Sequence, residues 1–156
     1  MGAWGIKSCE SDEGLDLLYS LEEDYLAQRK EISLSEIIEF LKEEDYLGET
    51  LEDIDFSYDN NAIAIAELYT SWSKESGFIG TDYDDSDEEG PWSKVKVFST
   101  DPSSLRLLLQ YLYDIKNEVP DEDGEREIVE LWKDSNSYEE WSEHINTLIE
   151  RMEALL

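Results

Sequence analysis

Apolar residues recur every three or four positions over most of this sequence, and that is the spacing of one face of an α-helix. In the last such segment Trp141, Ile145, Leu148 and Met152 keep this spacing. A half-buried strand would instead alternate apolar and polar residues at every second position. The pattern therefore predicts an all-α protein, a compact irregular bundle of about six helices.

The helices are expected at about 13–30, 33–46, 60–73, 102–115, 125–133 and 137–155. Ser33 and Ser137 each precede a glutamate by three residues, the spacing of a capping box, and Pro102 suits a first helical turn. The segment 60–73 is apolar nearly all round, which predicts a central, buried helix. Weak alternation at Lys94–Phe98 allows one short strand.

The chain of 156 residues has the length of one domain, so we expect a single helical domain over residues 1–156. Acidic residues crowd residues 81–90, and like charges at that density repel one another and extend the backbone. We therefore expect a mobile acidic loop at 81–90.

Charge limits what the protein can bind. The sequence has 41 acidic and 12 basic residues, a formal net charge of −29. Such a chain has too few cations to bind nucleic acid through its phosphates, and anionic membrane surfaces should repel it. No apolar run of about 18 residues is present, so no membrane span is expected. The expected partner is instead a basic protein, which a strong negative field attracts.

The acidic excess is concentrated in residues 43–93, where Lys74 is the one basic residue. The candidate binding residues are thirteen carboxylates of this span: Glu43, Glu44, Asp45, Glu49, Glu52, Asp53, Asp55, Asp82, Asp84, Asp85, Asp87, Glu88 and Glu89. Such an array could take the place of phosphates in a cationic groove, as an immunity protein or a nuclease inhibitor does. Two alternatives stay open: a passive soluble domain whose acidity serves solubility, and a carboxylate-dependent, metal-binding hydrolase.

The sequence marks no catalytic residue, no metal site and no cofactor site, and we expect a protein that is not an enzyme. A twelve-residue calcium loop needs glycine at its sixth position, where counts from Asp82 and Asp53 reach Asp87 and Tyr58. His144 is the only histidine, and we interpret it as a surface or packing residue. The single cysteine and the absence of a secretory signal at the start favour a cytoplasmic location. The oligomeric state is left open.

Both ends of the chain resemble one protein family. The opening Met1-Gly2-Ala3-Trp4-Gly5 and the helix start Ser11–Asp16 resemble those of the bacterial family named domain of unknown function 4259 (DUF4259). The alanine-rich segment 61–68, the run Glu130–Lys133 and the later Tyr138 and Trp141 resemble further parts of it. The resemblance implies a bacterial, cytoplasmic, all-helical domain, and it carries no catalytic residues.

Overall fold

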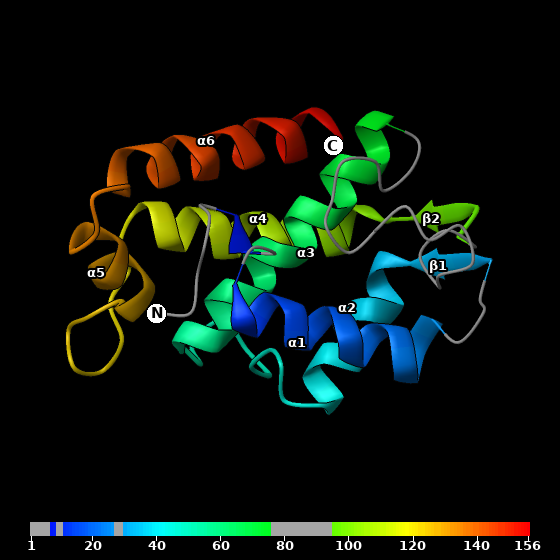
Figure 1. Ribbon diagram of the computed structural model, residues 1–156, viewed down its shortest axis with the longest axis horizontal. Coiled ribbons are helices and arrows are strands. Elements are labelled where there is room, and N and C mark those ends of the chain that lie inside the picture. The colour runs from blue at the N-terminus through cyan, green and yellow to red at the C-terminus, as the bar shows by residue number, and fades with distance from the viewer. Residues whose placement is uncertain (1–6, 9–10, 27–29, 76–94) are drawn as a thin grey trace.

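The computed structural model describes residues 7–8, 11–26, 30–75 and 95–156 (Figure 1), except for the side chains of residue 71 and residues 73–75. Within these ranges the helices are α1 (Asp12–Ser20), the π-helix η2 (Leu21–Leu26), α2 (Leu34–Glu43), α3 (Phe56–Glu75), α4 (Pro102–Lys116), α5 (Glu127–Lys133) and α6 (Tyr138–Ala154). Two short strands, β1 (Glu31–Ser33) and β2 (Val97–Ser99), complete the set. The predicted all-α class with six α-helices is confirmed.

Helix α3 lies at the centre of the bundle and contacts α1, α4, α5 and α6 (Figure 1). Every residue from 59 to 70 is buried, which confirms the prediction of a central buried helix. The alanines at positions 62, 64 and 66 present little side-chain volume, so neighbouring helices can approach closely. Because of this central position, a polar side chain within residues 59–70 of α3 lies in the interior of the protein.

The first predicted helix differs from the structure. We expected one α-helix over about 13–30, but the α-helix ends at Ser20 and a π-helix follows over Leu21–Leu26. Leu21, Tyr25 and Leu26 are all buried, at spacings of four and five residues. The wider turn of a π-helix, with its i→i+5 hydrogen bonds, suits that spacing better than an α-helical turn does.

The short predicted strand is present at a shifted position and has a partner that the sequence did not indicate. β2 covers Val97–Ser99, and it pairs in parallel with β1, with Ile32 opposite Phe98. Phe98 also makes an edge-on contact with Tyr69 of α3 at 4.9 Å between ring centroids. Three-residue strands are too short to show alternation, so the sequence pattern does not predict β1.

The capping box predicted at Ser33 and the helix start predicted at Pro102 are confirmed, the capping box predicted at Ser137 is wrong, and α3 begins earlier than predicted. The Ser33 hydroxyl accepts the Glu36 amide at 3.2 Å, and Asp101 accepts the Ser104 amide at 3.1 Å. Ser137 makes no such bond, since its backbone is not extended and its own amide donates to Ser135 Oγ. α3 begins four residues earlier than predicted, where the Asp55 carboxylate accepts the Ser57 amide at 2.8 Å.

Candidate functional site

The buried helix α3 carries polar side chains that the sequence pattern did not single out. Asp59, Asn60, Asn61, Glu67 and Thr70 are all buried. Asn60 donates to Ser11 Oγ, and Asn61 donates to the backbone carbonyl of Tyr46. Buried polar groups are costly unless they are hydrogen-bonded. Apart from Thr70, whose hydroxyl donates to the Ala66 carbonyl within α3, these residues mark the places where α3 is tied to its neighbours by specific bonds as well as by apolar packing.

The strongest of these ties is a buried ion pair between α3 and the start of α5. Arg126 donates from Nε and Nη2 to the two carboxylate oxygens of Asp59, at 2.9 and 2.6 Å, and from Nη1 to the carbonyl of Val119 at 3.1 Å. Both side chains are almost fully buried. Burial raises the pKa of Asp59 to about 6, although the hydrogen bond and the charge of Arg126 act to lower it.

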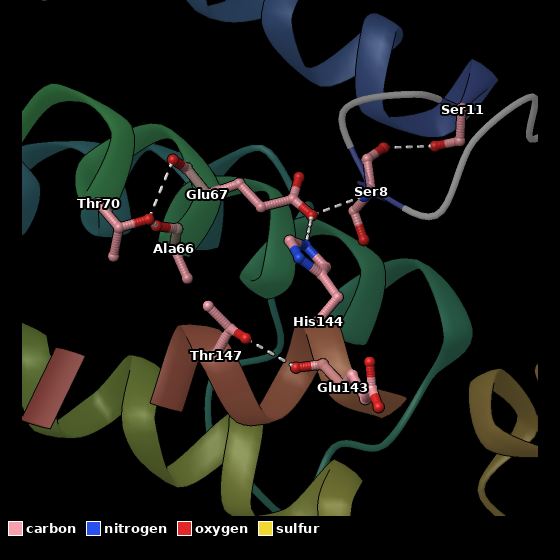
Figure 2. Close-up of polar contacts among 8 residues, drawn as sticks. All are labelled: Ser8, Ser11, Ala66, Glu67, Thr70, Glu143, His144 and Thr147. Atoms are coloured by element: carbon pink, nitrogen blue, oxygen red, sulfur yellow. Dashed lines mark hydrogen bonds and ion pairs between the residues drawn. The ribbon is translucent and has the colours of Figure 1, made fainter. Parts of the chain in front are cut away.

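A second polar cluster joins α3, α6 and the segment before α1, as Figure 2 shows. One carboxylate oxygen of Glu67, Oε2, contacts His144 Nε2 at 2.7 Å and accepts the backbone N–H of Ser8 at 2.8 Å. The Ser11 hydroxyl in turn donates to the Ser8 carbonyl at 2.6 Å. His144 is thus a packing residue, as predicted, but its acidic partner lies 77 positions away in the sequence and was not foreseen.

The candidate binding site is a cleft of about 290 Å³ that we call the acidic cleft. One wall comes from the connection between α2 and α3, and the other from the connection between α4 and α5. The lining residues are Glu52, Asp53 and Ile54 on the first wall and Asp121, Glu122 and Asp123 on the second. Five of the six carry a carboxylate, so the cleft has a high density of negative charge.

The buried ion pair holds the two walls of the acidic cleft together. Asp59 follows the first wall by five residues, and Arg126 follows the second by three. Gly48 supports the first wall, since a Cβ at that position would lie 2.5 Å from the Cβ of Asp53. In the second wall, the Asp121 carboxylate accepts the amides of Asp123 and Glu125. The Asp121 carboxylate therefore stabilises the turn at residues 121–125 through hydrogen bonds to backbone amides.

The structure brings only part of the predicted acidic set into this cleft. Glu43, Glu44, Asp45, Glu49, Glu52, Asp53 and Asp55 are all exposed, and of these Glu52 and Asp53 line the cleft. Asp45 accepts a hydrogen bond from Tyr58, which raises the pKa of the tyrosine to about 12, and Asp55 caps α3. The predicted residues Asp82, Asp84, Asp85, Asp87, Glu88 and Glu89, with the 81–90 loop, lie outside the described residues.

Sequence reasoning missed the second wall of the cleft. Asp121, Glu122 and Asp123 form a short acidic run between Pro120 and Gly124, outside the span 43–93 that has a single basic residue. That run was the available signal. The sequence does not show that this run lies close to Glu52 and Asp53. That proximity depends on the ion pair between Asp59 and Arg126, which are 67 positions apart.

Within residues 7–8, 11–26, 30–75 and 95–156, no three His, Cys, Asp or Glu residues are grouped so that they could hold a metal ion. No helix in the same ranges has the length and apolar character needed to cross a bilayer.

Comparison with known proteins places the chain in a family. No curated protein and no solved structure matches it. The sequence model of one family, described as "Domain of unknown function (DUF4259)", matches residues 2–144. This match covers nearly the whole chain and agrees with the resemblance of its two ends. The chain therefore belongs to the DUF4259 family.

Proposed function

We propose that this protein is a small acidic interaction protein that binds a basic protein partner through the acidic cleft. The partner would be of the kind that an immunity protein or a nuclease inhibitor recognises, with a cationic surface that ordinarily faces nucleic acid. We further propose that the protein is bacterial and acts in the cytoplasm, as an intracellular binder of this kind would. It has no enzymatic role in this proposal.

The observation that supports this function is that, among the residues that the structure describes, no carboxylate lining the cleft forms an ion pair. In the described part of the chain, the ion pairs join Asp59 to Arg126, Glu118 to Lys133 and Glu67 to His144. None of these uses a carboxylate that lines the cleft. A concave site lined by charges of one sign focuses the field and raises the local concentration of the opposite charge.

The shape of the cleft suits a long cationic side chain. Glu52, Asp53, Glu122 and Asp123 are exposed, and they can accept hydrogen bonds from a guanidinium or ammonium group, although Asp53 Oδ2 already accepts the Thr50 amide at 3.2 Å. Ile54 is half-buried in the same lining, where it can pack against the methylene groups of a lysine or arginine. Charge-assisted hydrogen bonds of this kind are stronger than neutral ones.

The test uses the protein as bait in an extract of the organism that encodes it, together with two variants of equal charge. The cleft variant carries Glu52→Gln, Asp53→Asn, Glu122→Gln and Asp123→Asn. The α6 variant carries four matched changes at exposed positions of α6: Glu139→Gln, Glu140→Gln, Glu143→Gln and Glu150→Gln. Captured proteins are identified and quantified at low and at high salt.

We expect the wild-type protein and the α6 variant to capture the same basic protein at low salt, and the cleft variant to lose it. High salt should weaken the capture, since exposed charges are screened. Equal capture by all three baits would contradict the role of the cleft. Failure to enrich any basic protein at low salt would contradict the function itself and favour a passive soluble domain.

A further inference from the structure

Arg126 makes contacts that reach beyond its ion pair with Asp59. Its Nη1 donates to the carbonyl of Val119, which precedes the second wall of the acidic cleft, while Arg126 itself follows that wall. The same guanidinium therefore closes the loop of residues 119–126 and, through Nε and Nη2, attaches the closed loop to Asp59 on α3. Because a guanidinium is planar and its donors form a rigid fork, these bonds fix the orientation of the loop as well as its distance from α3.

The loop that Arg126 closes is also ordered within itself. The Asp121 amide donates to the Glu125 carbonyl at 2.8 Å, and the Gly124 amide donates to the Asp121 carbonyl at 3.0 Å. Gly124 has a φ of 82°, a value that glycine adopts without steric strain. The second wall therefore forms one ordered turn, and its position opposite the first wall depends on the attachment through Arg126.

The first wall is attached to α3 by separate contacts. Tyr58, in the first turn of α3, donates to the Asp45 carboxylate at 2.7 Å, and within the connection Asp53 accepts the Thr50 amide at 3.2 Å. These bonds do not involve Arg126. A change at Arg126 should therefore displace the second wall while the first wall keeps its place.

We propose that Arg126 is a positioning residue of the acidic cleft, which holds the second wall opposite the first so that carboxylates of both walls bind one cationic side chain of the partner. Such a role rests on the proposed function. The Arg126 side chain is only 2% exposed, so it acts through the walls and does not touch the partner. Walls that are fixed before binding lose less conformational freedom when the partner binds, which favours affinity.

The test uses Arg126→Lys, which keeps the positive charge but loses the planar fork. A second-wall variant carries Glu122→Gln and Asp123→Asn, and its matched control carries Glu139→Gln and Glu140→Gln at exposed positions of α6. The affinity of a fluorescent peptide rich in lysine and arginine is measured by anisotropy for each variant, alone and combined with Arg126→Lys.

We expect Arg126→Lys to weaken binding several-fold, although every carboxylate of the cleft and the net charge are unchanged. The second-wall changes should weaken binding several-fold in the wild-type background and little in Arg126→Lys, where that wall no longer faces the ligand. A residue that only stabilised the fold would leave the second-wall effect the same in both backgrounds. The α6 control should have the same small effect in both.

Unchanged binding by Arg126→Lys, or an equal second-wall effect in both backgrounds, would overturn the role of Arg126 and leave the proposed function standing. Absence of binding by the wild-type protein would instead contradict the proposed function, and the role of Arg126 with it.

Hydrogen exchange of the amide of the buried residue Leu108 shows whether Arg126→Lys is folded. If it is not, variants with Arg126 intact decide. Glu52→Gln with Asp53→Asn changes the first wall alone, and the cleft variant changes both walls. Two walls that bind one side chain predict that the cleft variant weakens binding by less than the product of the two single-wall effects, and a full product would overturn the role of Arg126.

Discussion

Asp59 and Arg126 illustrate how a single buried contact determines the geometry of a surface site. Asparagine keeps the size of Asp59 and, like the protonated carboxyl that a pKa of about 6 favours, leaves Arg126 beside a neutral partner. We therefore expect Asp59→Asn to change the free energy of unfolding by about 1 kcal/mol or less at pH 5, where wild-type Asp59 is itself largely protonated. Asp59→Ala removes both acceptors that Asp59 offers to Arg126 and should cost more. Urea unfolding of both variants at pH 5 checks this order, and an equal or reversed order would contradict it.

The same buried carboxylate predicts a dependence of stability on pH. The pKa of Asp59 is raised from an ordinary value of 3.8 to about 6, so between these values the folded state holds a proton that the unfolded chain releases. Stability from this group is therefore highest at low pH and is lost as pH rises through about 6, with a loss of about 1 kcal/mol between pH 5 and pH 7. NMR titration of the Asp59 carboxyl carbon checks the cause. A midpoint below pH 4 would contradict it.

Only some of the residues that line the cleft could be predicted from the sequence. Glu52 and Asp53 were among the predicted binding residues because they lie in a span with one basic residue. Asp121, Glu122 and Asp123 were not, because their place in the cleft depends on a contact between distant segments. Local sequence indicates which residues carry charge, but it does not indicate which charged segments meet.

The helix starts allow a matched comparison of caps. Asp101 accepts a helix amide with its side chain, whereas Ser137 stands at a helix start without doing so. Loss of a capping side chain costs about 1 kcal/mol. We expect Asp101→Ala to lower the free energy of unfolding by about that amount, and Ser137→Ala to change it little. Thermal unfolding of the two variants measures the difference, and similar losses in both would show that the assigned caps are wrong.

Elements with a long, regular pattern could be predicted, and short or irregular ones could not. α4 begins at Pro102 as expected, and Leu105, Leu108 and Leu112 form its buried face. The π-helix Leu21–Leu26 and the strand Glu31–Ser33 were missed, since each is six residues or fewer. In such short segments tertiary packing decides the backbone conformation, and no period is long enough to reveal it.

For the molecule as a whole, the excess of negative charge should oppose folding. Among the described residues, the exposed acids of α2 and of the α2–α3 connection have no ion-pair partner, so their mutual repulsion is relieved only by solvent and salt. We expect the melting temperature to rise between 20 and 300 mM NaCl at pH 7.5. An unchanged or lower melting temperature would show that the net charge of −29 does not strain the fold.

The central claim is that the acidic cleft, and not the net charge alone, selects a cationic partner. Its most direct measurement is the affinity of a fluorescent lysine- and arginine-rich peptide for wild type, the cleft variant and the α6 variant, by anisotropy at several salt concentrations. Because exposed ion pairs contribute up to about 1 kcal/mol each, the cleft variant should bind roughly tenfold more weakly than wild type, with a smaller salt dependence. The α6 variant should stay close to wild type. Equal weakening of the two variants would contradict the claim.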